Sequence, residues 1–194
     1  MIVGLTGGIC AGKSTATAEL RALGANVLDC DDLARYLTDF DPQLRGAIRD
    51  NWPQAFYAAG GLNRRRLAEI VFGESAQRVK LEQILHPLIL ETVKLNVTAE
   101  RQRGQHLVIV VPLLFELGMQ DLFDATWLIA CEPEVQLARL MQRNRLEAEE
   151  ARRWLAAQWP LERKLPLATL VLRNDAKIDD LQTAVRSAWE GVLK

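Results

Sequence analysis

Residues 2 to 15 read Ile-Val-Gly-Leu-Thr-Gly-Gly-Ile-Cys-Ala-Gly-Lys-Ser-Thr, and this stretch decides the fold. An apolar segment typical of a strand, Ile2 to Leu5, leads into the spacing Gly7-x-x-x-x-Gly12-Lys13-Ser14. Helix-favouring residues follow at once, from 16 to 23. The pattern predicts a strand, a glycine-rich turn and a helix in immediate succession.

The same spacing predicts a site for a polyphosphate. Backbone N–H groups must wrap the phosphates, and glycines let the chain turn tightly with no side chain in the way. The helix that follows offers the anion its positive dipole end and its unpaired N–H groups. We expect Lys13 to reach the β- and γ-phosphates and the Ser14 hydroxyl to hold Mg²⁺. The alternative is a glycine-rich turn that fits the pattern by chance, but the flanking strand and helix favour the nucleotide site.

Composition limits the classes of protein that remain. With 194 residues, 49% of them hydrophobic, the chain can bury one sizeable core. Lys and Arg number 24 against 25 Asp and Glu, so the chain lacks the basic field that holds nucleic acid, and we expect no nucleic-acid partner.

Neither a membrane partner nor a signal peptide is expected. Apolar runs such as 107–114 are shorter than the roughly 20 residues that span a bilayer, and the apolar N-terminus belongs to the first strand. Three cysteines without a CxxC spacing indicate reduced thiols used in packing, and hence a cytoplasmic protein.

Alternating strand and helix signals predict an α/β fold with a parallel five-stranded sheet flanked by helices. Gly24 is placed to end the first helix, and residues 178–193 form a closing amphipathic helix. The five expected strands are 2–5, 25–29, 106–111, 125–131 and 167–172.

Residues 31–104 carry helical signals and no convincing strand, which is far longer than an ordinary crossover. We therefore expect a helical lobe over the sheet edge, where an acceptor substrate docks, and a core of about 1–30 and 105–194. Within the lobe, Arg64 opens a helix after a glycine turn, and Pro87 ends one helix at His86 and starts the next. The arginine cluster could instead be a solvated face, and the histidine a packed or capping residue.

Carboxylates follow the second strand at the end where ligands of a parallel sheet bind. Asp31 is the candidate base, although Asp31 and Asp32 also suit plain helix capping, and Asp29 is the next candidate. The third strand has no acidic residue before Pro112, so the metal must rely on Ser14, water and ATP, with Asp29 or Asp31 as possible support.

A charged segment from 145 to 164 follows a helix on which Arg139 and Arg143 share one face. Such a segment can close over ATP, exclude water and bring cations to the transferred phosphoryl group. We expect a lid at about 144–165; the alternative is a solvated helix.

Together these motifs resemble the dephospho-coenzyme A kinase family, and the resemblance spans nearly the whole chain. The segments that carry it are 3–15, Asp29-Cys-Asp-Asp-Leu-Ala-Arg35, Leu85-His-Pro-Leu-Ile89, Val111-Pro-Leu-Leu-Phe-Glu116 and Gln136-Leu-Ala-Arg-Leu-Met-Gln-Arg143, with Gln158, Lys164 and Asn174.

The resemblance implies a P-loop kinase that transfers the γ-phosphoryl group of ATP to the ribose 3′-hydroxyl of dephospho-CoA, as a monomer or weak homo-oligomer. The catalytic residues would be Asp31, Lys13, Arg139 and Arg143. ATP would lie on Gly7, Gly8, Ile9, Cys10, Ala11, Gly12, Lys13, Ser14, Thr15 and Asn174, the acceptor on Asp31, Arg64, His86 and Leu114, and Mg²⁺ on Ser14.

Three residues depart from the family pattern: Cys10 stands in place of a glycine, and Asn144 and Thr169 in place of aspartates. We expect the Cys10 side chain to be able to point away from the phosphates. Two other readings remain open, namely a kinase acting on a nucleoside or nucleotide and a nucleotide switch. A GTPase switch would carry Asn-Lys-x-Asp and Asp-x-x-Gly motifs, which the chain lacks.

Overall fold

A computed structural model describes the backbone of residues 1–194 and every side chain except those of Phe72 and Ser75. The chain divides into two compact units. Residues 1–29 and 97–194 form the first unit, and residues 30–96 form the second.

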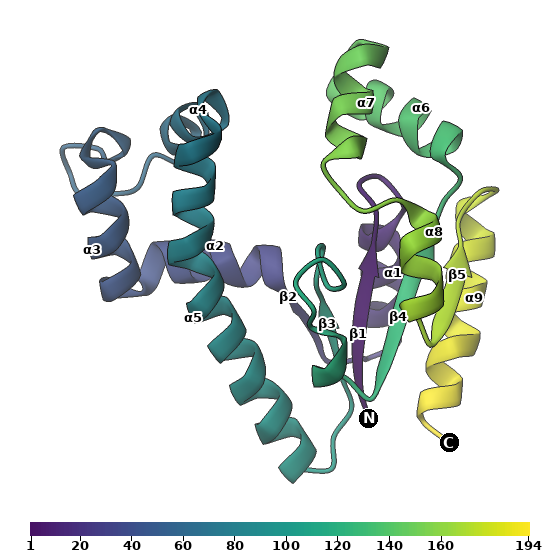
Figure 1. The fold of residues 1–194 in the computed structure, drawn as a ribbon. Coiled ribbons are helices and arrows are strands. Elements are labelled where there is room, and N and C mark those ends of the chain that lie inside the picture. The colour runs from purple at the N-terminus through teal and green to yellow at the C-terminus, as the bar shows by residue number, and fades with distance from the viewer. The chain divides into compact units, whose positions relative to one another are not determined.

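The first unit is built on a five-stranded parallel sheet with the order β2-β3-β1-β4-β5, which confirms the predicted fold class (Figure 1). The central strand β1 pairs with β3 on one side and with β4 on the other. The strands are β1 (Ile2–Gly7), β2 (Val27–Asp29), β3 (Leu107–Val110), β4 (Ala125–Ala130) and β5 (Leu170–Arg173).

Helices cover both faces of this sheet. In Figure 1, α1 and α9 lie behind the sheet and α8 lies in front of it. The helices of this unit are α1 (Lys13–Ala22), α6 (Pro133–Asn144), α7 (Ala148–Ala156), α8 (Leu161–Lys164) and α9 (Ile178–Val192), with short 3₁₀ turns at Gln120–Leu122 and Leu165–Leu167.

The main core fills the space between the sheet and the two helices behind it. Val3 and Leu5 of β1 point to that face, because alternate residues of a strand share a side. Leu20 of α1 and Leu181 and Val185 of α9 pack against them, and all five are at most 1% exposed. This packing holds the end of β1, and the loop that follows it, against a rigid layer.

One local signal in this unit has the predicted outcome, and a second is shifted along the chain. Gly24 has φ 79 just after α1 and donates its N–H to Arg21 O, as a glycine that ends a helix should. The strand expected at 167–172 begins later, at Leu170, because Pro166 supports a 3₁₀ turn there. Thr169 joins the neighbouring strand by its side chain: its Oγ1 accepts from Thr126 N and donates to Thr126 O.

The second unit is helical, with one isolated antiparallel bridge between Phe56 and Leu62. Asp41 and Asn63 cap two of its helices by accepting N–H bonds from the first turn. Its elements are α2 (Cys30–Phe40), α3 (Pro42–Asn51), the 3₁₀ turn Pro53–Ala55, α4 (Arg64–Gly73) and α5 (Ser75–Gln102), which crosses the boundary into the first unit.

The prediction that Pro87 divides two helices is wrong, because α5 is continuous and carries Pro87 inside it. A proline in a helix interior costs about 3 kcal/mol, mainly through one lost hydrogen bond and a steric clash. The half of α5 beyond the proline buries Val93 and Val97, which are 0% and 4% exposed, and this burial offsets the cost. His86 therefore lies within a helix, not at a helix boundary.

Among the helices that the structure describes, none combines the length and the apolar character needed to cross a bilayer.

Candidate active site

The glycine-rich loop leaves β1 at Gly7 and enters α1 at Lys13. Gly12 is the N-cap of α1 and has φ 112, a conformation that favours glycine. A Cβ atom at Gly12 would also overlap the Asn174 amide. The α1 N-terminus has no side-chain cap, which suits a helix end that binds an anion.

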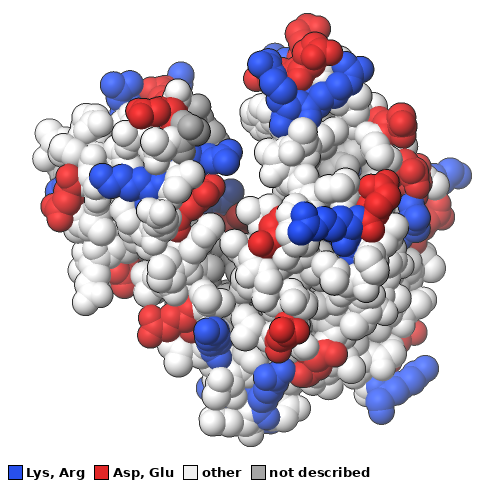
Figure 2. Space-filling model, in the orientation of Figure 1, with Lys and Arg blue, Asp and Glu red and all other residues white. Residues whose placement is uncertain are grey.

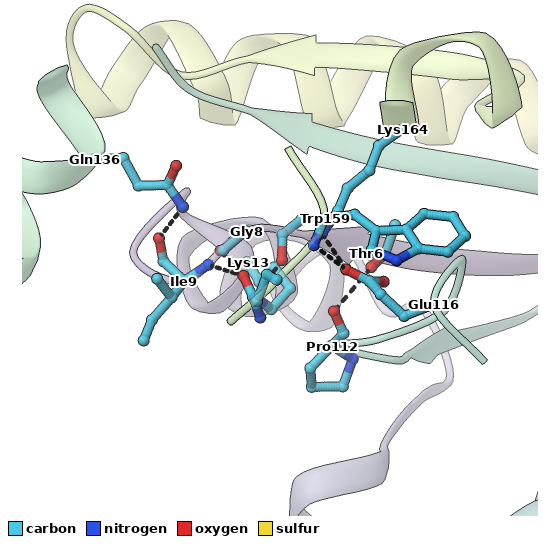
Figure 3. Close-up of polar contacts among 11 residues, drawn as sticks. Thr6, Gly8, Ile9, Lys13, Pro112, Glu116, Gln136, Trp159 and Lys164 are labelled. Atoms are coloured by element: carbon cyan, nitrogen blue, oxygen red, sulfur yellow. Dashed lines mark hydrogen bonds and ion pairs between the residues drawn. The ribbon is translucent and has the colours of Figure 1, made fainter. Parts of the chain in front are cut away.

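Lys13 folds back over this loop. Its ammonium donates to Gly7 O at 2.6 Å and to Gly8 O at 3.0 Å. Lys13 and Gly8 are labelled in Figure 3. The side chain thus spans the turn from the helix to the strand end, with its charge held at the loop.

Cys10 has φ 58, in the left-handed region that favours glycine. This explains why a glycine would be the easier residue at this position. Cys10 is half-buried and contributes to the wall of a hollow beside the loop.

This hollow, which we call the phosphate-side hollow, has a volume of about 450 Å³. It brings together loop residues and α6 residues that are far apart in the sequence. Its lining residues are Cys10, Gly12, Ser14, Thr15, Arg139, Gln142, Arg143, Asn174 and Ile178. The structure therefore gathers half of the expected ATP-binding residues, together with both expected arginines, around one space.

The two arginines of α6 are held differently. Arg139 donates to the backbone carbonyl of Asn174 at 2.9 Å. Arg143 donates to the side chain of Asn144 at 2.8 Å, so the residue that departs from the family pattern holds a predicted site arginine. Since both cations line the same hollow, an anion bound there would meet two guanidinium groups.

Asn174 is 6% exposed and ties β5 to the loop. Its Nδ2 donates to Ala11 O at 2.7 Å, and its backbone N–H donates to Ala130 O. Its side-chain Oδ1 is buried and has no protein donor among the described residues. This acceptor lies in a residue that lines the phosphate-side hollow.

Three of the expected site residues belong to the second unit. Asp31 is exposed in the first turn of α2. Arg64 opens α4, as predicted, pairs with Asp39 at 2.9 Å and donates to Arg35 O. His86 is half-buried in the middle of α5.

Leu114 lies in the first unit and is fully buried. A Cβ atom on Gly4 would come within 2.7 Å of it, so its side chain packs on β1 in the core.

Four side chains lie on the other side of the loop: Gln136, Gln158, Glu116 and Lys164. Sequence reasoning gave the first three no role and counted Lys164 among the exposed cations of the expected lid, whereas Lys164 is 2% exposed. Both glutamines bond the peptide groups of Ile9, and the other two form a buried ion pair. All four lay within or beside the motifs that carried the resemblance, but no local pattern indicated their partners.

The buried thiols are structural. Cys30 and Cys131 are 7% and 3% exposed. Burial raises the pKa of Cys131, although the nearby Arg139 guanidinium acts in the opposite direction. A neutral buried thiol is inert, which agrees with the packing role expected for these residues.

Charges of both signs gather over α7 in Figure 2. Glu149 and Glu150 lie in its first turn, and Arg152 pairs with Glu149 at 2.9 Å. The cations that line the phosphate-side hollow come from α6 and not from α7.

Three features together define a P-loop kinase. They are a parallel sheet with β1 at its centre, a glycine loop that enters α1 and holds the Lys13 ammonium, and two arginines that line one hollow beside this loop. Comparison with known proteins gives the family. The family model for dephospho-CoA kinase matches residues 1–180. A dephospho-CoA kinase of Streptococcus thermophilus is 38% identical over 189 residues, which are 97% of this chain and 96% of that protein.

Comparison with solved structures agrees with this family match. TT1252 from Thermus thermophilus has a TM-score of 0.77 and 33% identity, and the match covers 98% of this chain and 97% of that one. Dephospho-CoA kinase from Campylobacter jejuni shares the fold, with a TM-score of 0.71, 23% identity and coverage of 98% and 96%. The chain belongs to the dephospho-CoA kinase family, as the motifs indicated.

Proposed function

We propose that this protein transfers the γ-phosphoryl group of ATP to the ribose 3′-hydroxyl of dephospho-CoA, giving CoA and ADP. The observation that carries the proposal is the convergence of the glycine loop, Arg139 and Arg143 on one hollow of about 450 Å³, in a chain of this family. The family match favours dephospho-CoA over a nucleoside or nucleotide as the acceptor.

Phosphoryl transfer needs position and charge more than covalent help from the protein. The loop amides and the α1 N-terminus hold the β- and γ-phosphates. Lys13 stabilises the charge that moves towards the leaving oxygen, and Arg139 and Arg143 stabilise the equatorial oxygens of the transferred group. Asp31 orients the attacking hydroxyl and accepts its proton.

Mg²⁺ suits the donors that line the hollow. Ser14 supplies a hydroxyl there, and no group of three or more acidic, histidine or cysteine side chains able to hold a metal occurs among the described residues. Such a site fits Mg²⁺, which keeps several waters and binds substrate phosphates. When bound, the ion supplies positive charge between the phosphates.

The acceptor is assigned to the helical second unit, with Asp31, Arg64 and His86 as its contacts. Leu114, whose side chain is buried, would contribute through the main chain. The segment of about 144–165, which contains α7 and α8, is assigned as the lid, and Trp159 and Lys164 tie its C-terminal part to Glu116. A cytoplasmic location fits three cysteines without a CxxC spacing.

The test is a coupled assay of ADP release with ATP, Mg²⁺ and dephospho-CoA, on the unchanged chain and on two aspartate variants. Asp31→Asn keeps the size and capping ability of the side chain but loses its charge, so turnover should fall at least ~100-fold while ATP still binds. Asp32→Asn is the matched control. Asp32 pairs with Arg35 on the surface at 3.0 Å, so the loss of its charge should change turnover little.

Normal turnover of Asp31→Asn, or greater damage in Asp32→Asn, would move the role of base to Asp29. ADP release that does not depend on dephospho-CoA would contradict the proposed acceptor.

A further inference from the structure

The two peptide groups of Ile9, in the glycine loop, are held by two glutamines from distant parts of the chain. Figure 3 shows one of them, Gln136, bonded to Ile9. Gln136 in α6 donates from Nε2 to Ile9 O at 2.5 Å. Gln158, between α7 and α8, accepts from Ile9 N–H through Oε1 at 2.8 Å. One glutamine therefore acts as donor and the other as acceptor on the same loop residue.

The glutamines approach the loop from a second hollow. This glutamine-side hollow of about 300 Å³ is lined by Gln136, Gln158, Gly8 and Ala11, among others. The phosphate-side hollow is lined instead by Cys10, Gly12, Ser14 and Thr15. The two glutamines thus bind Ile9 from the glutamine-side hollow, and they leave the loop residues that line the phosphate-side hollow available for a nucleotide.

Gly8 makes this approach possible. A Cβ atom at position 8 would overlap the Gln136 amide, so a larger residue would displace this amide from its contact with the loop. The glycine here serves the contact with α6 as well as the turn.

The position of Gln158 is set by the residues that follow it. Glu116, just beyond β3, accepts from Trp159 N–H at 3.1 Å and lies 2.7 Å from the Lys164 ammonium. Lys164 is 2% exposed and Glu116 13%. This pair fixes the connection between α7 and α8 to the segment that follows β3, and with it the chain around Gln158.

We propose that Gln136 and Gln158 are positioning residues for the nucleotide. They hold the Ile9 peptide groups so that the neighbouring loop amides are already arranged when ATP arrives, and Glu116 with Lys164 holds Gln158 in place. Without them the loop must be ordered at the expense of binding free energy, so nucleotide affinity falls. This role rests on the proposed function in one respect, namely that the bound nucleotide is ATP.

The test measures Mg-ADP binding by titration calorimetry and KM for ATP against kcat in the kinase assay. Gln136→Met and Gln158→Met keep the length of each side chain and remove its hydrogen bond. Each should raise the Kd for Mg-ADP and the KM for ATP about three- to tenfold, the effect of one hydrogen bond, with kcat nearly unchanged. In the double variant, Kd and KM should rise by less than the product of the two single-variant factors, because both glutamines hold the same residue.

Gln105→Met is the control, since Gln105 is exposed in the turn that precedes β3, and it should leave both constants unchanged. A second pair of variants tests hydrogen-bond direction with matched charge. Gln158→Glu keeps an acceptor for Ile9 N–H and should bind Mg-ADP more tightly than Gln136→Glu, which sets a carboxylate against a carbonyl.

Unchanged Kd and KM in folded variants would overturn the proposal, and so would equal effects of the two glutamate variants. Tighter binding by Gln158→Met would also overturn it, by showing that Gln158 competes with the nucleotide. The activity of the wild-type protein with dephospho-CoA, measured in the same series, tests the proposed function independently of the two glutamines.

Discussion

At the scale of single residues, backbone conformation explains most of the loop. Gly12 has a φ that glycine adopts freely, whereas Cys10 adopts a left-handed φ at some cost. The expectation that Cys10 is tolerated stays a prediction, but its place on the wall of the phosphate-side hollow makes it a direct probe of that hollow.

Cys10 should be the thiol that iodoacetamide modifies first, because Cys30 and Cys131 are buried. Bound Mg-ATP should slow this modification several-fold by covering the hollow that Cys10 lines. Mass spectrometry of the labelled peptide with and without Mg-ATP measures the effect.

Cys10→Gly is the control for that experiment. It should abolish the fast label and raise the midpoint of thermal unfolding by about 2–4 °C, because it relieves about 1 kcal/mol of backbone strain. Equal labelling rates with and without Mg-ATP would show that Cys10 does not line the nucleotide site.

At the scale of elements, contacts between distant segments determine where helices continue and how strands and helices are joined. Local sequence signals do not settle these points. Pro87 lies within one continuous helix although its local signal favours a break. The edge of β5 is joined to Thr126 through the Thr169 hydroxyl, where the family pattern has an aspartate. The α7–α8 connection is anchored by one carboxylate beyond β3.

That anchor gives a stability prediction. Glu116→Gln still accepts from Trp159 N–H but leaves the Lys164 ammonium buried with no counter-charge, so unfolding free energy should fall by about 3–5 kcal/mol. Lys164→Met leaves the opposite charge unpaired. Urea unfolding of both single variants and of the double variant measures the coupling.

The double variant should be less destabilised than the sum of the two single variants, because it leaves neither charge unpaired. Strict additivity would show that the two side chains act independently. Gln105→Met again serves as the control, because Gln105 forms no part of the Glu116–Lys164 pair.

At the scale of the whole molecule, the first unit joins chain segments from both sides of the second unit in sequence. Asp124 links the two segments, since it accepts from Ile2 N–H at 2.7 Å, and it also pairs with Arg101 of its own segment at 2.5 Å. Burial alone would raise the pKa of Asp124, but these hydrogen bonds, with the charges of Arg101 and the N-terminus, hold it below its ordinary value of 3.8.

This shift predicts how stability depends on pH. A carboxylate with a lowered folded pKa stabilises the protein above its unfolded pKa of about 3.9 and loses that effect as pH falls through the folded value. Asp124→Asn should therefore be less stable than the unchanged chain at pH 6, and the gap should narrow towards pH 3. Urea midpoints across this range test the prediction, and a gap independent of pH would refute it.

Much of the fold could be predicted from the sequence. Each of the five strands follows from an apolar run, and the glycine loop follows from the spacing of Gly7, Gly12 and Lys13, because strand burial and turn geometry depend on neighbouring residues. The start of α4 at Arg64 follows in the same way from the glycine turn before it.

Sequence alone determined that this chain is a P-loop kinase of the dephospho-CoA kinase family, because ordered local motifs carry that information. Only the tertiary structure decided that α5 continues through Pro87, and that Ile9 is held by Gln136 and Gln158, which lie 127 and 149 residues away. The physical reason is that helix continuity there depends on burial, and hydrogen bonds between distant residues depend on how layers pack, neither of which spacing along the chain specifies.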